Sequence, residues 1–264
     1  MITIRGMEEL ARLEQASRVV LETLDVLEKA VAPGVTTDEL DGIAAEEIRK
    51  RNAKPAFLNY RGFPKTICTS VNDEVVHGIP GRRSLKEGDI VGIDCGAIVE
   101  GYYGDAARTL PVGRIDASRR KLLEVTRRAL EAGIAAAQPG GRVSDIGAAV
   151  EAVALAHGYG VVREFVGHGV GTALHEEPQV PNYGPAGRGS TLKAGMVLAI
   201  EPMFNLGTGD VNVDRDGWTV RTRDKSASAH FEYTIAIVPA GPVVLGTGRL
   251  GAVGAREATA AVPA

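Results

Sequence analysis

Two stretches of the chain repeat one pattern. Residues 84–94 read SLKEGDIVGID, and residues 191–201 read TLKAGMVLAIE, an ungapped match 107 positions further along. Each stretch passes through a glycine turn into an apolar strand pattern and ends in a carboxylate, Asp94 in the first and Glu201 in the second. One explanation is chance similarity between common turn and strand patterns. The other is a pair of related halves, each presenting one acid to a shared axis.

The residues upstream of these stretches favour the second explanation. Pro33-Gly34 recurs as Pro139-Gly140, and Thr37-Asp38 recurs as Ser144-Asp145, at nearly the same offset. A helix, a Pro-Gly break, a second helix and a strand therefore occur twice in the same order. We predict an α/β fold of the α+β type, in which two halves related by an approximate two-fold axis form one domain over residues 1–250.

Apolar spacing and turn residues predict the other elements. Helices are expected at about 7–30, 36–51, 117–137 and 144–157, with Thr36 and Ser144 as N-caps of the second and fourth. Residues 55–80 are irregular and strand-like, and strands are expected at about 90–94, 102–110, 161–166, 196–201, 211–213, 217–222 and 230–238. The Ala- and Gly-rich residues 251–264 are expected to be a disordered tail.

The composition excludes several classes of protein. Among the 264 residues, 44% are apolar and 24% charged, which is typical of a globular protein rather than a disordered or fibrous one. A net charge of −3 and a pI of about 6.0 argue against a nucleic-acid-binding surface. Cys68 and Cys95 are too few for a disulfide framework, and neither a membrane span nor a signal peptide is evident. We expect a cytoplasmic protein.

Asp94 and Asp105 are predicted to share one face of a hairpin. If Glu100-Gly101 is a two-residue turn, Gly96 pairs with Asp105, and Asp94 lies two residues away on the same face. A four-residue turn over 98–101 would instead place Asp94 directly opposite Asp105. Either register brings the carboxylates within about 5–8 Å of each other. Because the surrounding strands are apolar, a metal ion is the simplest way to neutralise both charges.

Two more acids and three histidines extend this cluster. Glu201 and Glu232 lie in strands that otherwise read as buried, and His77, His168 and His175 lie in glycine-containing segments. Taken singly, each acid could be a solvated edge residue and each histidine a structural one. Together, the four carboxylates and one of these imidazoles suit two divalent cations, because four negative charges balance two ions of +2. Such a ligand set without cysteine indicates Mn, Fe, Co or Zn, and two such ions activate water for hydrolysis.

Several motifs make the chain resemble the methionine aminopeptidases over about residues 5–245. They are VNDEVVHGIP at 71–80, Asp94 with Asp105 eleven positions later, GHGVG at 167–171, HEEP at 175–178 and AIEP at 199–202, with Glu232 completing the set. Without an insertion between His175 and Glu201 or a zinc-binding N-terminal extension, the chain is similar to the short bacterial type I form. The resemblance implies a pita-bread fold, in which helices cover the outer face of a curved, mainly antiparallel sheet.

The resemblance also implies roles for the site residues. The family's metal ligands match Asp94, Asp105, His168, Glu201 and Glu232, with Asp105 and Glu232 bridging two divalent ions. A metal-bound hydroxide would attack the carbonyl that follows the N-terminal Met of the substrate. Glu201 would shuttle protons, His175 would stabilise the oxyanion, and His77 would contact the scissile amide.

Further positions match the family's binding sites. The Met pocket would be lined by Tyr60, Phe63, Cys68 and Trp218 beside the two substrate-facing histidines. Leu174 stands where the family usually has Phe, which would enlarge or reshape this pocket. Asn72 and Ser228 match two positions of a site for a monovalent cation, Na or K.

The resemblance predicts removal of the initiator methionine from nascent proteins whose second residue is small. The enzyme would be a monomer that associates transiently with the ribosome. Two alternatives remain open. A proline-cleaving peptidase of the same fold shares the metal ligands but usually carries an extra N-terminal domain, for which this chain has no room. A non-catalytic binding protein of this fold would lack metal ligands, whereas all five positions are filled here.

Overall fold

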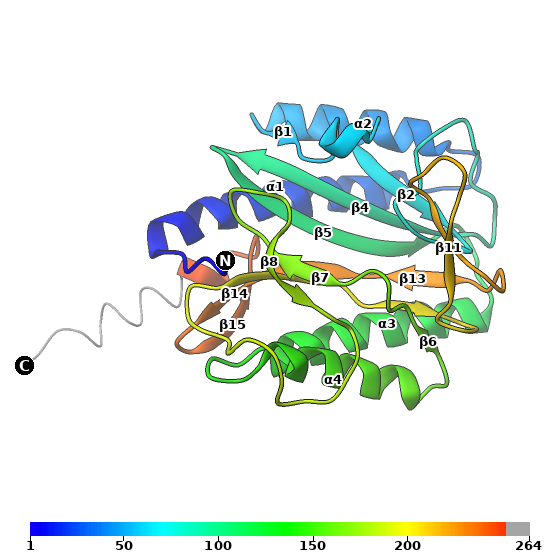
Figure 1. The fold of residues 1–264 in the computed structure, drawn as a ribbon. Coiled ribbons are helices and arrows are strands. Elements are labelled where there is room, and N and C mark those ends of the chain that lie inside the picture. The colour runs from blue at the N-terminus through cyan, green and yellow to red at the C-terminus, as the bar shows by residue number, and fades with distance from the viewer. Residues whose placement is uncertain (252–264) are drawn as a thin grey trace, which may run out of the picture.

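A nine-stranded sheet organises residues 1–251, the part of the chain that this computed structural model describes (Figure 1). Its main path runs in the order β1 (Lys54–Pro55), β4 (Ile90–Val99), β5 (Tyr102–Pro111), β14 (Glu232–Val238), β9 (Val197–Ile200), β7 (Gly167–Gly169) and β8 (Glu176–Val180). In addition, β2 (Ile67–Val71) pairs with β4, and β15 (Gly241–Val244) pairs with β14. All these pairings are antiparallel. The prediction for residues 252–264 of the tail lies outside the described residues.

Two small sheets complete the strand arrangement. One has the order β13 (Ser228–His230), β10 (Met203–Asn205) and β6 (Gly160–Val161), and the other β11 (Val211–Val213), β12 (Val220–Thr222) and β3 (Glu74–Val76). A short 3₁₀ helix, η1, covers Tyr60–Gly62.

Helices pack in two pairs, one against each half of the large sheet. α1 (Met7–Ala30) lies along β4 and β5, with α2 (Thr37–Lys50) beside it (Figure 1). α3 (Ala117–Ala136) packs against α4 (Val143–Leu155) and reaches β5, β9 and β14. No helix within residues 1–251 is long and apolar enough to cross a membrane.

The two halves repeat the same local contacts. Thr36 forms an isolated β-bridge with Ser84, and Arg142 forms the corresponding bridge with Thr191. After each Pro-Gly break, the glycine N–H donates a 2.8 Å hydrogen bond to a leucine carbonyl, from Gly34 to Leu85 and from Gly140 to Leu192. These contacts hold the loop before α2 and the loop before α4 against the turn that leads into the matching strand, β4 or β9.

The helices match the predicted ranges to within about two residues, but one N-cap differs. α2 begins with the predicted capping box, in which Thr36 and Glu39 exchange hydrogen bonds. α4 begins after Arg142 rather than Ser144. The Arg142 N–H donates to the Asp145 carboxylate at 2.7 Å, whereas the Ser144 hydroxyl accepts the N–H of Arg188.

Several strands differ from the prediction, because a strand exists only where a partner pairs with it. The strand expected at 90–94 continues to Val99, since β1 and β5 pair with its second half. The one expected at 161–166 is reduced to Gly160–Val161. The one expected at 230–238 is broken at Phe231, where the chain leaves β10 and joins β5.

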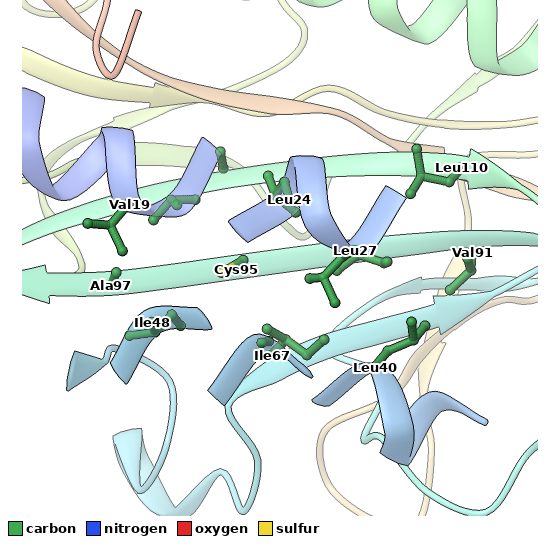
Figure 2. Packing of buried hydrophobic residues seen from close by; sticks show 14 of the residues in the cluster. Val19, Leu24, Leu27, Leu40, Ile48, Ile67, Val91, Cys95, Ala97 and Leu110 are labelled. Atoms are coloured by element: carbon green, nitrogen blue, oxygen red, sulfur yellow. The ribbon is translucent and has the colours of Figure 1, made fainter. Parts of the chain in front are cut away.

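Apolar side chains from both helices of the first half meet the sheet. Figure 2 shows Leu24 and Leu27 of α1 and Leu40 of α2 in one cluster with Cys95 of β4 and Ile67 of β2. All five are at most 1% exposed. This packing fixes α1 on β4 and β5, the strands that carry the first two acids, and α2 against α1, β1 and β2.

Gly104 brings β5 directly against α1. A Cβ atom at this position would lie 2.5 Å from the backbone of Ala16 and Ser17, and no flexible side chain could give way. We predict that Gly104→Ala lowers the free energy of unfolding by about 1–3 kcal/mol in chemical denaturation. Gly42→Ala on α2, where nothing lies within 4 Å, is the control and should be neutral or stabilising by up to about 1 kcal/mol. Equal destabilisation by the two substitutions would contradict the prediction.

Candidate metal centre

Strand register places four of the predicted ligands over one patch of the sheet. The Glu100-Gly101 turn has positive φ at both residues, +50° and +84°, as a two-residue hairpin turn requires. Gly96 therefore pairs with Asp105, and Asp94 pairs with Ala107, which excludes the four-residue turn.

Ala107 also pairs with Glu232 on the next strand, so the acids of β4 and β14 flank it in one row. Between them, Ala107 contributes only a methyl group to the row. His168 pairs with Ala199 on the neighbouring β7–β9 ladder, and Glu201 follows directly after β9.

The side chains of the cluster are close enough to share ligands. His168 Nε2 lies 3.4 Å from Glu201 Oε1 and 3.9 Å from Asp105 Oδ2. One ligand atom from each of Asp105, His168 and Glu232 lies within 4.8 Å of the other two. Asp105 and Glu232 are 5% and 2% exposed, so water does little to screen their charges.

Burial perturbs every titratable group of the cluster. It raises the pKa of Asp94 to about 7, and burial together with neighbouring carboxylates raises the pKa values of Asp105, Glu201 and Glu232. Burial lowers the pKa of His168 to about 3, so its imidazole is neutral and able to ligate a metal.

The orphaned oxygens of the cluster fit divalent metal ions. Asp94 Oδ1, Asp105 Oδ1 and Glu232 Oε1 are buried and have no hydrogen-bond partner among the described residues. Unpaired buried carboxylate oxygens are costly, and a cation removes that cost while restoring the charged form. Carboxylate oxygens with one imidazole nitrogen are the donor set for which the sequence indicated Mn, Fe, Co or Zn.

His77 and His175 lie at the border of this cluster on different walls. The rings of His175 and His168 are 4.2 Å apart, and His175 Nδ1 is 2.8 Å from the Tyr60 hydroxyl. His77 has a left-handed backbone, with a φ of +61°, and its ring meets Phe165 and Trp218 edge-on. The structure therefore brings both predicted substrate-facing histidines to the same cavity.

A cavity of about 310 Å³ opens onto the acids. Its apolar lining includes all four residues predicted for the Met pocket, Tyr60, Phe63, Cys68 and Trp218, and also Leu174. Phe63 and Leu174 are 1% and 3% exposed, and the Phe63 ring packs edge-on against Trp218. An apolar pocket that ends at a cluster of acids can hold an uncharged side chain beside a hydrolytic centre.

His230 is part of the site and was missed by the sequence analysis. It is 3% exposed, and its Nε2 lies 3.7 Å from Glu201 Oε2 and 4.0 Å from Glu232 Oε2. The sequence could have indicated His230, because residues two apart along a strand face the same side of the sheet. The predicted strand from 230 to 238 would have placed His230 beside Glu232.

Asn72 and Ser228 are adjacent in the structure. The Ser228 N–H donates to the Asn72 carbonyl at 2.8 Å. The Asn72 side chain donates to Asp89 and accepts the Ile90 N–H, and the Ser228 hydroxyl donates to the Phe204 carbonyl. Their polar side-chain atoms thus have protein partners.

The sequence profile of metallopeptidase family M24 matches residues 11–239. The chain belongs to metallopeptidase family M24. It is 50% identical over 246 residues to the methionine aminopeptidase of Clostridium acetobutylicum, in a match covering 93% of this chain and 98% of that protein. The crystal structure of methionine aminopeptidase from Rickettsia prowazekii superimposes with a TM-score of 0.92 at 44% identity, covering 93% of this chain and 100% of that one.

These matches confirm the predicted resemblance and the pita-bread fold. This M24 chain is a hydrolytic enzyme, an aminopeptidase of the methionine aminopeptidase type. A prolidase from Pyrococcus furiosus shares the fold alone, with a TM-score of 0.73 at 22% identity, covering 92% of this chain and 65% of that one.

The raised pKa of Asp94 predicts how pH changes the stability of the metal-free protein. Unfolding returns this pKa from about 7 to its ordinary value of 3.8, so between these values the unfolded chain binds fewer protons. Stability should therefore fall as pH rises from about 4 to 7. After chelation, we expect the wild-type Tm to decline more between pH 5 and 7.5 than that of Asp94→Asn. Parallel Tm profiles would contradict this prediction.

Proposed function

We propose that this chain is a metal-dependent aminopeptidase that removes the N-terminal Met from newly made polypeptides whose second residue is small. The observation that carries the proposal is the apolar cavity that ends at the buried acids Asp94, Asp105, Glu201 and Glu232. A Met side chain is flexible and apolar, and it suits a pocket walled by aromatic rings and Leu174. The relatives named methionine aminopeptidases support the same substrate.

In this proposal two divalent cations, Co, Mn, Fe or Zn, would be held by Asp94, Asp105, His168, Glu201 and Glu232, and Asp105 and Glu232 would serve both ions as bridging ligands. When bound, such ions would supply Lewis acidity, which lowers the pKa of a coordinated water and polarises a nearby carbonyl. The two bridging residues are the most deeply buried acids of the cluster, which supports their central position.

Glu201 is proposed to carry protons between water and the leaving amine. Its carboxylate is 12% exposed at the edge of the cavity, and its two oxygens face different imidazoles, those of His168 and His230.

His175 is proposed to stabilise the oxyanion that forms on the scissile carbonyl. When the Tyr60 hydroxyl donates to Nδ1 across their 2.8 Å contact, Nε2 carries the ring hydrogen and can donate it toward the substrate. His77, on the wall shared with Trp218, is proposed to contact the scissile amide.

The remaining expectations belong to the same proposal. Residues 1–250 act as one catalytic domain, and Leu174 widens the pocket relative to the Phe usual in the family. Asn72 and Ser228 belong to a site for a monovalent cation, Na or K, formed mainly by backbone oxygens. The enzyme works in the cytoplasm as a monomer and meets nascent chains during transient association with the ribosome.

Release of free Met tests the proposal directly. Metal-free protein is supplied with Co, Mn, Fe or Zn in turn and assayed on Met-Ala-Ser, Met-Gly-Met and an Xaa-Pro peptide. We expect metal-dependent Met release and an intact Xaa-Pro peptide. Cleavage of the Xaa-Pro peptide alone would indicate a proline-specific peptidase, and folded protein that binds no metal and cleaves nothing would indicate a binding protein.

Glu201→Gln tests the proton-transfer role. The substitution keeps the shape of the side chain but removes a charged ligand and the titratable group. We predict that kcat falls by at least about 100-fold, the lower end of general acid–base contributions, while the circular dichroism spectrum is unchanged. Near wild-type turnover at matched metal content would assign the proton transfer to another group.

A further inference from the structure

The segment before α1 reaches across to the second half of the fold. The Arg5 N–H donates to the Gly195 carbonyl at 2.8 Å, and Arg5 is only 8% exposed. Its Nη2 lies 2.7 Å from each carboxylate oxygen of Glu176, and its Nη1 lies 3.1 Å from Glu9 Oε1. Glu176 of the HEEP motif is therefore the partner of a buried arginine.

Glu176 also holds the loop that precedes it. Its Oε1 accepts the N–H of Thr172 at 2.8 Å and the N–H of Ala173 at 3.2 Å. One carboxylate thus ties two backbone amides of the loop to the guanidinium of Arg5. Charge-assisted hydrogen bonds of this kind are stronger than those between neutral groups.

Gly171 makes room for this contact. A Cβ atom on Gly171 would lie 2.0 Å from Arg5 Nη2 and 2.4 Å from Glu176 Oε1. The Gly171 carbonyl accepts the N–H of Tyr103, which fixes the start of the loop to β5. The loop over residues 171–176 is therefore anchored at both ends, at β5 and at the Arg5–Glu176 pair.

This loop carries two residues of the proposed site. Leu174 is 3% exposed and lines the cavity, and His175 stacks on Tyr60 beside His168. Tyr60 is the only described residue that hydrogen-bonds the His175 ring. The position of that ring therefore depends on the loop backbone as well as on Tyr60.

We propose that Arg5 and Glu176 are positioning residues that hold the 171–176 loop and thereby place His175 over the scissile bond. The inference rests on the proposed function, because the role of His175 is part of that proposal. Neither Arg5 nor Glu176 is proposed to contact the substrate. Neither lines the cavity, so they act through the loop that carries Leu174 and His175.

The contacts of Arg5 and Glu176 with the 171–176 loop are called the clamp below. Glu176→Gln tests this clamp, with Glu177→Gln as a matched control. The glutamine keeps the size of the side chain but loses the charge that pairs with Arg5. Glu177 is the next residue, is exposed, and makes no side-chain hydrogen bond or ion pair within residues 1–251. In Glu176→Gln, the Thr172 and Ala173 amides should exchange hydrogen with solvent at least about 10-fold faster than in wild type or Glu177→Gln. Equal exchange in the two variants would overturn the clamp, whether or not the protein releases Met.

The kinetic arm tests whether the clamp acts through His175. On Met-Ala-Ser at matched metal content, we expect Glu176→Gln to lower kcat by roughly 10- to 100-fold, the range for a misplaced catalytic group, with a smaller change in KM. Arg5→Lys should retain more activity than Arg5→Met, because lysine keeps the positive charge that pairs with Glu176. It should still be less active than wild type, because lysine lacks the paired N–H groups of the guanidinium.

A double-mutant cycle separates positioning from a general loss of stability. In a His175→Ala background, Glu176→Gln should cause little further loss of kcat, because the residue it positions is already gone. If the two substitutions lower kcat independently, so that their fold losses multiply in the double variant, the positioning role is overturned while the proposed function stands. An inactive wild-type enzyme would instead reject the proposed function, and hydrogen exchange would still decide whether the clamp exists.

Discussion

The burial of four carboxylates on one side of one sheet is the constraint on which the rest of this structure depends. Asp94, Asp105 and Glu232 come from three neighbouring strands, and Glu201 follows a fourth. Without a cation, burial raises the pKa of each acid, so the site is stable in its charged form only when positive charge is supplied. The paired strands at the centre of the sheet hold these groups together.

The internal repeat explains how one sheet can bring so many acids together. The first half supplies Asp94 and Asp105 from a single hairpin, and the second half supplies His168, Glu201 and Glu232. Neither half contains all five proposed ligands, so the set comes together only when the halves pair through β5 and β14. Small residues maintain that arrangement, with Ala107 between two acids and Gly104 beneath α1.

The cavity walls depend on a different kind of contact. Trp218 lies in the turn between β11 and β12. Arg221 on β12 is 2.6 Å from both Asp214 and Glu74, and it thus ties this hairpin to β3. Leu174 and His175 lie on the loop held by Arg5 and Glu176. The proposed metal ligands are thus placed by strand register, whereas Trp218, Leu174 and His175 lie on segments that ion pairs hold in place. Loops are the parts of a fold that vary most readily, so pocket shape can change while the metal centre is retained.

The sequence alone determined the repeat, the helices, the Asp94–Asp105 hairpin face and the acids at the strand ends, because these follow from local periodicity and turn chemistry. Its motifs also indicated the residues that line the cavity. It could not choose between two hairpin turns, show that the strand before Glu232 breaks at Phe231, or reveal His230 as a neighbour of Glu201. It also gave no role to Glu176, whose partner Arg5 lies 171 positions away. Those features depend on which strands and loops meet in space, and only the tertiary structure decides such long-range pairing.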